Sequence, residues 1–268
     1  MNALRFDPDS DRPSLLHLVA DEVVQASVDL DDPSYLDAEY MQRISYLVDA
    51  MAPAKRPLRV LHLGAGALAM ARYVAATRPE SYQQAVETNQ ELVALVRAKA
   101  PLPRRVKVKI RHTDARQAVE AAPEDCYELI IGDVYDRARV PAHVTTVEFL
   151  SEVKRVLRPG GHYAVNLCDG GRMRFLKPAL AAMSAVWPHL AIMVEPAIMR
   201  GKRFGNVVAV AADAELPAEV LRRRCAGAPF PCRVVAGAEL AEYVGGATPA
   251  TDAAAIASPP PPASLRSF

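Results

Sequence analysis

Apolar segments that end at a glycine-rich turn or near an acidic residue recur in a fixed order along this chain. The first, Val60–Gly66, ends in a Gly-Ala-Gly turn. Later segments end near Glu87, Asp114 and Asp133. Each has the length of a buried strand, and open α/β sheets bind ligands at the carboxyl ends of such strands. The order therefore indicates a nucleoside-type cofactor laid across the carboxyl ends of several parallel strands.

The overall composition restricts the class of protein. With 268 residues, 51% of them hydrophobic, the chain is long enough for one large α/β domain with a sizeable core. Its 32 basic and 31 acidic side chains give a formal net charge of +1, so the totals predict no nucleic-acid partner. Because no run of roughly 18 apolar residues and no secretory leader is present, neither membrane spanning nor secretion is expected.

The cysteines point to a reducing compartment. They show no C-x-x-C pair and no spacing typical of zinc ligands: Cys126, Cys168, Cys225 and Cys232. A disulfide framework is therefore not expected, and no metal site is predicted. Free thiols suit the cytoplasm, which is the expected location.

Alternating strands and helices define the main part of the chain. Apolar segments predict seven strands, at about 58–63, 82–87, 106–111, 127–132, 162–167, 189–195 and 205–211. Helical spacing separates them, at about 67–78, 89–99, 115–121, 144–157 and 172–187. This alternation specifies right-handed crossovers, and the short connection before the last strand specifies an antiparallel closing pair. The sequence thus predicts a doubly wound, mostly parallel, seven-stranded α/β sheet of the Rossmann-like kind.

Three regions are expected. Residues 1–34 alternate loosely between apolar and polar positions, which predicts a short β-hairpin that must pack on the main domain. Residues 35–246 form the nucleoside-cofactor domain, which opens with a helix from Tyr35 to Met51. Residues 247–268 carry four consecutive prolines among Ala, Ser and Thr, which predicts a mobile extension without a role in the core.

The glycine turn fits the pattern G-x-G-x-x-A from Gly64 to Ala69, between a strand and a helix. Glycines such as Gly64 and Gly66 allow a tight turn and a close approach to a ligand, and the helix amino terminus offers free N–H groups. Glu87 follows Gly64 by 23 residues, a distance that suits hydrogen bonds to ribose hydroxyls. The alternatives are a turn without a ligand and a solvated glutamate at the end of a strand.

Further carboxylates follow the next two strands. Asp114, with Ala115, opens a helix, so it is either a helix N-cap or an acceptor for an adenine amino group. Asp133 would face the reacting end of the cofactor, and Asp136 could bracket the same cationic group. The alternative for both is a pair of exposed loop acids. Tyr135 between them either lines the acceptor pocket or packs against other side chains in the core.

The turn Leu157–Gly161, with the sequence L-R-P-G-G, helps to separate two cofactor classes. Its proline and glycines stop a helix and lead into a strand. Folds that bind nicotinamide dinucleotides share the glycine turn and the ribose acid. The order helix, L-R-P-G-G, strand instead resembles the class I S-adenosylmethionine-dependent methyltransferase fold, so we favour a cofactor of the S-adenosylmethionine type.

Within that superfamily the chain most resembles the spermidine synthase, or polyamine aminopropyltransferase, family. The family has a glycine-rich turn, V-E-I-D after the second strand, D-A or D-G after the third, and I-I-x-D-S-S-D-P after the fourth. The corresponding segments here are Leu61–Gly66, Val86–Asn89, Asp114–Ala115 and Ile130–Arg137, with Glu39–Gln42 where the family has Y-x-E-M. The resemblance spans roughly residues 15–211.

This resemblance implies roles for the site residues. Decarboxylated S-adenosylmethionine, or methylthioadenosine after transfer, would be bound by Gly64, Gly66, Glu87, Asp114, Ala115 and Asp133. Glu87 would hold the ribose, and Asp114 and Ala115 the adenine. Asp133 would also orient and deprotonate an attacking amine, because a protonated amine has no lone pair for attack on a sulfonium carbon. Tyr40 and Asp136 would contact the amine substrate, and the family expectation is a homodimer.

Two loops depart from the family pattern. Ala67 and its neighbours stand where the family's glycine loop carries an aspartate, and Ile198 stands where it has a tyrosine near the diamine. Arg200, Lys202 and Arg203 place cations where a dication would arrive, and at ~10 Å each pair of charges would interact by about 1–2 kcal/mol. An S-adenosylmethionine-dependent methyltransferase of a small or anionic acceptor, and a non-catalytic family member, are therefore the alternatives.

Overall fold

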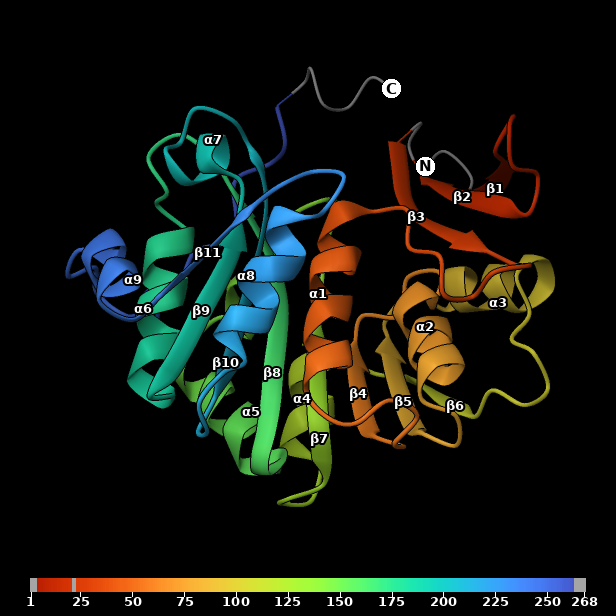
Figure 1. The fold of residues 1–268 in the computed structure, drawn as a ribbon, viewed down its shortest axis with the longest axis horizontal. Coiled ribbons are helices and arrows are strands. Elements are labelled where there is room, and N and C mark those ends of the chain that lie inside the picture. The colour runs from red at the N-terminus through yellow and green to blue at the C-terminus, as the bar shows by residue number, and fades with distance from the viewer. Residues whose placement is uncertain (1–3, 21–22, 263–268) are drawn as a thin grey trace.

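The structure, a computed structural model, describes residues 4–20 and 23–262 and contains a large sheet with helices on both faces and a small sheet beside it (Figure 1). The strands of the large sheet are β4 (Arg59–Leu63), β5 (Tyr82–Glu87), β6 (Val108–His112), β7 (Tyr127–Gly132), β8 (Leu157–Asp169), β9 (His189–Val194), β10 (Gly205–Ala212) and β11 (Arg233–Ala236). They form one eight-stranded sheet in the order β11-β9-β10-β8-β7-β4-β5-β6.

Most of this sheet is parallel. β6, β5, β4, β7 and β8 pair in parallel, whereas β10 pairs antiparallel with β8 and β9, and β11 pairs antiparallel with β9. The predicted α/β class is confirmed. The sheet has one strand more than the seven predicted, because β11 has only four residues and too short an apolar run to be recognised.

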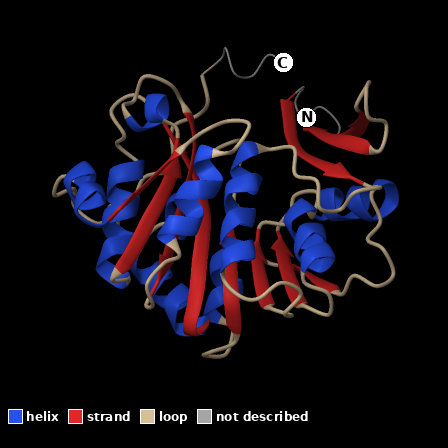
Figure 2. Ribbon diagram, viewed as in Figure 1, coloured by secondary structure: helices blue, strands red, loops and turns tan. Residues whose placement is uncertain are grey.

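Helices cover both faces of the large sheet (Figure 2). One face carries α1 (Glu39–Ala50), α2 (Ala69–Thr77) and α8 (Ala218–Ala226), with α3 (Gln90–Lys99) beside α2. The other carries α4 (Ala115–Glu120), α5 (Val147–Val156), α6 (Leu176–Val186) and α9 (Gly237–Val244). Short helical turns, η1 (Ala142–Val144) and α7 (Pro196–Met199), lie in loops. Within the described residues, none of the helices is both long enough and apolar enough to cross a bilayer.

The central strands are buried on both faces, which explains their unbroken apolar sequences. Leu61 and Leu63 of β4 and Ile130 of β7 face the core beneath α4–α6, and Val60 and Leu129 face the core beneath α1 and α2. The sheet thereby becomes a rigid platform, and the chain segments that leave its carboxyl edge are held in fixed places.

The amino-terminal region is a three-stranded antiparallel sheet of β1 (Arg5–Pro8), β2 (Leu15–Ala20) and β3 (Val23–Asp29). β2 and β3 form the predicted hairpin, whose turn at residues 21 and 22 lies outside the described residues, and β1 adds a strand. Leu18, Ala26 and Val28 pack against Ala67 in the glycine turn and against Ala100. The small sheet therefore supports the turn that follows β4.

The carboxyl-terminal segment, which was predicted to be a mobile extension without a role in the core, packs against the main domain over residues 247–262. The Ala250 N–H donates to the Pro178 carbonyl at 3.1 Å, and the Ala250 carbonyl accepts from the Val147 N–H at 2.9 Å. Ser258 is fully buried. Backbone groups and small side chains make these contacts, so a Pro- and Ala-rich composition gave no sign of them. The remaining residues of the predicted extension, 263–268, lie outside the described part of the chain.

Candidate active site

The strand order reverses between β4 and β7. From β4 the chain runs outward through β5 to β6, and it then returns to the other side of β4 as β7. Such a reversal opens a crevice at the carboxyl edge of a sheet, where doubly wound proteins bind ligands. Gly64 follows β4 and Asp133 follows β7, and the Asp133 N–H donates to the Leu63 carbonyl at 2.8 Å. Two of the segments predicted to form the site therefore meet at this reversal.

The glycine turn packs directly against the Asp133 backbone. Gly64 has a φ of +89°, and a Cβ atom there would lie 2.2 Å from the Asp133 carbonyl oxygen. Gly66 also has a left-handed backbone, with a φ of +47°. Any side chain at Gly64 would push the Asp133 loop away from β4, so this glycine is required both for its backbone conformation and for the close approach.

Glu87 ends β5 and faces the glycine turn. One carboxylate oxygen accepts the Ala65 N–H at 3.2 Å, and the other accepts the Asn89 N–H at 2.9 Å. Each carboxylate oxygen has lone pairs left for further donors. The side chain is half-buried and is held beside the turn by these bonds, as a ribose-binding acid would need to be.

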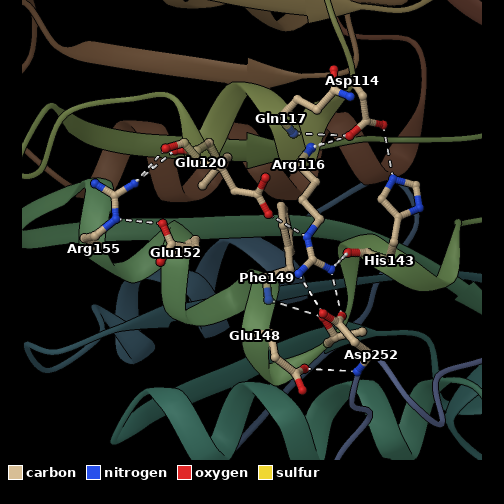
Figure 3. A network of polar contacts seen from close by, with 12 residues as sticks. Asp114, Arg116, Gln117, Glu120, His143, Glu148, Phe149, Glu152, Arg155 and Asp252 are labelled. Atoms are coloured by element: carbon tan, nitrogen blue, oxygen red, sulfur yellow. Dashed lines mark hydrogen bonds and ion pairs between the residues drawn. The ribbon is translucent and has the colours of Figure 1, made fainter.

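Asp114 is the N-cap of α4, and its side chain accepts the N–H groups of Arg116 at 2.8 Å and Gln117 at 3.3 Å (Figure 3). His143 contacts the second carboxylate oxygen at 3.1 Å. Burial raises the pKa of Asp114, but the hydrogen bonds from His143 and the two backbone N–H groups outweigh it and lower the pKa overall. Asp114 thus performs the capping function that was the structural alternative, and Ala115 behind it is buried.

Asp133 lies at the centre of a three-residue cluster. Its carboxylate accepts the Tyr40 hydroxyl at 2.9 Å and the Asn166 side-chain amide at 3.1 Å. Tyr40 comes from the first turn of α1, and Asn166 is a buried residue of β8, the strand beside β7. The sequence pointed to Asp133 and Tyr40 but missed Asn166, whose only sign was a polar residue inside an apolar strand.

The environment of Asp133 adjusts its acidity. Burial raises the pKa of Asp133 to about 6, and the hydrogen bonds from Asn166 and Tyr40 oppose the increase. A general base functions best when its pKa lies near the working pH. Asp133 is therefore largely ionised at neutral pH and is basic enough to take up a proton.

The loop after Asp133 makes a tight turn. Asp136 and Arg139 each donate a backbone N–H to the other's carbonyl, at 2.8 and 3.0 Å. Arg137 and Ala138 between them have positive φ angles of 46° and 61°. The Asp136 side chain is exposed, and no other side chain in the described part of the protein bonds to its carboxylate. Tyr135 is partly buried and packs beside the Cys168 thiol.

A buried ion-pair network fixes α1 beside this cluster. The Arg43 guanidinium, 2% exposed, pairs with Glu195 at 3.2 Å and with Glu39 at 3.5 Å. Glu195 also pairs with Arg203. The network joins the helix that carries Tyr40 to the loop around α7, and it was not predicted because its central pair, Arg43 and Glu195, lies 152 positions apart in the sequence.

The second of the two loops that depart from the family pattern lies around α7. Ile198 is fully buried and packs against Gly205, whose added Cβ would lie 2.3 Å from the Ile198 side chain. Arg200 and Lys202 are exposed, and no carboxylate of residues 4–20 and 23–262 lies within 4.0 Å of either cation. Ile198 is thus a packing residue, and two free cations lie in the same loop.

His62, which lies inside β4, is a core residue. It is 4% exposed, and its ring nitrogen lies 2.8 Å from the Gln83 side-chain oxygen. Burial lowers the pKa of His62 to about 4, which keeps the ring neutral. Within the described residues, no three His, Cys, Asp or Glu side chains are grouped so that they could hold a metal ion.

Comparison with known sequences finds relatives of one kind. No protein-family model matches the chain. A polyamine aminopropyltransferase from Chromobacterium violaceum is 28% identical over 164 residues, which make up 59% of this chain and 59% of that protein. The chain thus spans about three fifths of the length of this curated relative.

One solved structure covers nearly the whole chain. The crystal structure of a probable spermidine synthase from Corynebacterium glutamicum is 32% identical, covers 93% of this chain and 92% of that chain, and superposes with a TM-score of 0.86. Human methyltransferase-like protein 13, solved with SAH, is 20% identical, covers 69% of this chain and 86% of that chain, and gives a TM-score of 0.53. The second likeness shows a shared methyltransferase-like fold.

Proposed function

Since this chain belongs to the spermidine synthase, or polyamine aminopropyltransferase, family, we propose that it transfers an aminopropyl group from decarboxylated S-adenosylmethionine to an amine acceptor. The observation that carries the proposal is the cluster of Tyr40, Asp133 and Asn166 at the strand reversal. It holds a carboxylate of raised pKa beside the glycine turn, where a bound nucleoside would present its reacting carbon.

The nucleoside part of the donor would lie beside the glycine turn, Glu87 and Asp114, which we call the nucleoside half of the crevice. The acceptor half is the part around Asp133 and the loop that follows it. Glu87 would bind the ribose through its remaining lone pairs, and Asp114 with Ala115 would bind the adenine. Gly64 and Gly66 leave room for the nucleoside beside the turn. Under this proposal methylthioadenosine is the co-product and needs the same contacts.

Asp133 has two tasks in the proposed reaction. It attracts the ammonium form of the acceptor and accepts one proton from it, directly or through water. The free amine then attacks the methylene carbon next to the sulfonium, a C–N bond forms, and the C–S bond breaks with its electron pair left on sulfur. Moving a proton from an ordinary amine, with a pKa near 10, to a carboxyl group of pKa about 6 costs about 5 kcal/mol, which desolvation of the ammonium reduces.

Tyr40 and Asn166 orient the carboxylate for this step. Both donate hydrogen bonds that favour its ionised form, so they keep Asp133 ready to accept a proton at neutral pH. Asp136 and Tyr135 would contact the acceptor from the same loop. We expect the protein to act as a cytoplasmic homodimer, as the family resemblance implies.

A second candidate function rests on the loop after α7. Arg200 and Lys202 are exposed cations without carboxylate partners among the described residues, and they would repel a polyamine. These cations would instead attract an anionic acceptor, which favours an S-adenosylmethionine-dependent methyltransferase of a small or anionic acceptor. The Asp133 cluster favours the first function, and this loop favours the second.

Calorimetric titration separates these functions. The purified protein is titrated at fixed salt with decarboxylated S-adenosylmethionine, S-adenosylmethionine and methylthioadenosine. Preference for the decarboxylated donor or methylthioadenosine supports aminopropyl transfer, and preference for the carboxylated form supports methyl transfer. If none of the three binds, both enzymatic proposals fail.

A further inference from the structure

The carboxyl-terminal strap, which we define as residues 247–262, is bonded to both halves of the crevice. At the nucleoside half, the Arg116 guanidinium forms two hydrogen bonds of 2.7 Å to the Asp252 carboxylate (Figure 3). The same guanidinium contacts the carbonyl of His143, the residue whose ring contacts Asp114. Asp252 thus holds the Arg116 side chain, which contacts the backbone of the residue whose ring bonds to Asp114, the acid proposed to bind adenine.

At the acceptor half, Ser258 pairs with the end of the Asp133 loop. The Ser258 hydroxyl accepts the Val140 N–H at 2.8 Å, and the Ser258 N–H donates to the Val140 carbonyl at 3.0 Å. The Arg139 side chain donates to the Ser258 carbonyl at 2.6 Å. The hydroxyl also lies 3.3 Å from the thiol of Cys168, beside which Tyr135 packs. Because Ser258 is fully buried, water does not compete for these bonds.

The loop that Ser258 holds has an unfavourable conformation. Arg137 and Ala138 occupy the two central positions of a two-residue turn with both φ angles positive, which Asn-Gly or Gly-Gly adopts far more readily. Residues in such regions cost of order 1–3 kcal/mol each and persist only where the surroundings hold them. Here the surroundings are the Leu63 carbonyl, bonded to Asp133 at the start of the loop, and Ser258, bonded to Val140 at its end.

We propose that the strap completes the active site, with Ser258 as a positioning residue that holds the Asp136 turn against the acceptor amine and Asp252 as a positioning residue for the nucleoside half. This inference rests on the proposed function, because it assigns the two halves to an amine and a nucleoside. The acceptor pocket then depends on the strap, which follows β11, the last strand of the large sheet, by about ten residues or more.

A strap that only stabilises the fold would behave differently. Loss of either anchor would then lower the melting temperature and leave the affinities of the folded protein unchanged. If the strap positions the site, loss of Ser258 should change the KM for the acceptor and loss of Asp252 should change the affinity for the nucleoside, because the two anchors lie at opposite ends of the crevice. The test therefore compares single substitutions at each end.

Ser258→Ala removes the hydroxyl that accepts the Val140 N–H and leaves the bond from the Ser258 N–H to the Val140 carbonyl in place. We expect the KM for the acceptor amine to rise about five- to tenfold, with the affinity for methylthioadenosine within twofold of the wild type. Asp252→Asn breaks the charged pair with Arg116, and we expect methylthioadenosine affinity to fall about three- to tenfold with little change in acceptor KM. Asp213→Asn is the matched control, because it removes an ion pair with Lys154 at the opposite edge of the sheet.

Hydrogen exchange provides a readout independent of activity. Ser258→Ala should speed amide exchange at residues 134–140, and the Asp213→Asn control should not. Unchanged exchange at residues 134–140 would overturn the strap proposal. So would a parallel change of the acceptor KM and the methylthioadenosine affinity in both Ser258→Ala and Asp252→Asn. If the wild-type protein neither binds a nucleoside nor turns over, the proposed function fails, and the exchange measurement still decides whether Ser258 holds the loop.

Discussion

The two halves of the crevice are built in opposite ways. In the nucleoside half, the carboxylates of Glu87 and Asp114 accept hydrogen bonds from backbone N–H groups of their own or neighbouring segments, and the pKa of Asp114 is lowered. In the acceptor half, Asp133 bonds to side chains 93 and 33 positions away, and burial raises its pKa. Backbone bonds favour a fixed negative charge, whereas a desolvated carboxylate held by two side chains can exchange a proton.

We propose a different task for each half. A carboxylate that accepts backbone N–H groups, as Glu87 and Asp114 do, is held in a fixed place and suits the recognition of hydroxyl and amino groups. A carboxylate of intermediate pKa suits proton transfer. Substitutions in the two halves should therefore separate binding from turnover.

The largest effect is expected at Asp133. Asp133→Asn keeps the shape of the side chain but removes the proton acceptor, so turnover should fall by about 10²-fold or more. Methylthioadenosine affinity, measured by calorimetry, should stay within about twofold of the wild type. Unchanged turnover would remove Asp133 from the mechanism and abolish the contrast between the halves.

A substitution in the nucleoside half should instead weaken cofactor binding. Glu87→Ala removes the proposed ribose contacts, and nucleoside binding should weaken by about 1–3 kcal/mol, measured by the same titration. Glu91→Ala, a substitution of an exposed glutamate in the first turn of α3, is the control for loss of charge. Equal affinities of wild type and Glu87→Ala would refute the ribose assignment.

Stability should depend on pH through Asp133. Its pKa is about 6 in the folded protein against 3.8 for the ordinary side chain, so the folded state retains a proton that the unfolded state releases. As pH rises from about 4 to 6, the folded protein therefore loses stability at this site. Asp133→Asn avoids that loss and should raise the free energy of unfolding by about 1–3 kcal/mol at pH 8.

The gain from Asp133→Asn should vanish below pH 4, where both states of the wild-type carboxyl group are protonated. The oxygen of the new amide can still accept from the Asn166 side chain, and its NH2 group can donate to the Tyr40 hydroxyl oxygen, which is an acceptor as well as a donor. Denaturant unfolding at pH 8 and pH 4 measures the effect. A gain of equal size at both values would show that burial does not shift this group.

The smallest effect is expected in the turn after Asp136. Ala138→Gly relieves a left-handed alanine, and should stabilise the protein by about 0.5–1 kcal/mol. Ala241→Gly, in the interior of α9, is the opposite control and should destabilise by a similar amount. Denaturant midpoints of the two variants would move in the same direction if the turn were not strained.

The sequence predicted more of the nucleoside half than of the acceptor half, for a physical reason. The glycine turn, Glu87 and Asp114 are local motifs at the ends of apolar segments, and period and spacing were enough to find them. Asn166 and Arg43 act through contacts across the fold, and a polar residue among apolar ones has no partner that spacing can identify. Tyr40 was found only through the family resemblance.

The strap shows a second limit. Ser258 and Asp252 stand among prolines and alanines, and this composition predicts mobility because it offers little apolar surface to bury. Their backbone and carboxylate contacts become visible only when α4 and the Asp136 turn are in place. β11, with four residues, was missed for the related reason that a short strand needs a neighbour to define it.

The central claim, aminopropyl transfer at the Asp133 cluster, is tested most directly by product analysis. The protein is incubated with decarboxylated S-adenosylmethionine and a panel of amines that includes diamines and amines with an anionic group, and both products are measured by mass spectrometry. We expect methylthioadenosine and an aminopropylated amine in equal amounts, at a rate reduced about 10²-fold or more in Asp133→Asn. Transfer of a methyl group from S-adenosylmethionine, with no methylthioadenosine formed from the decarboxylated donor, would contradict it.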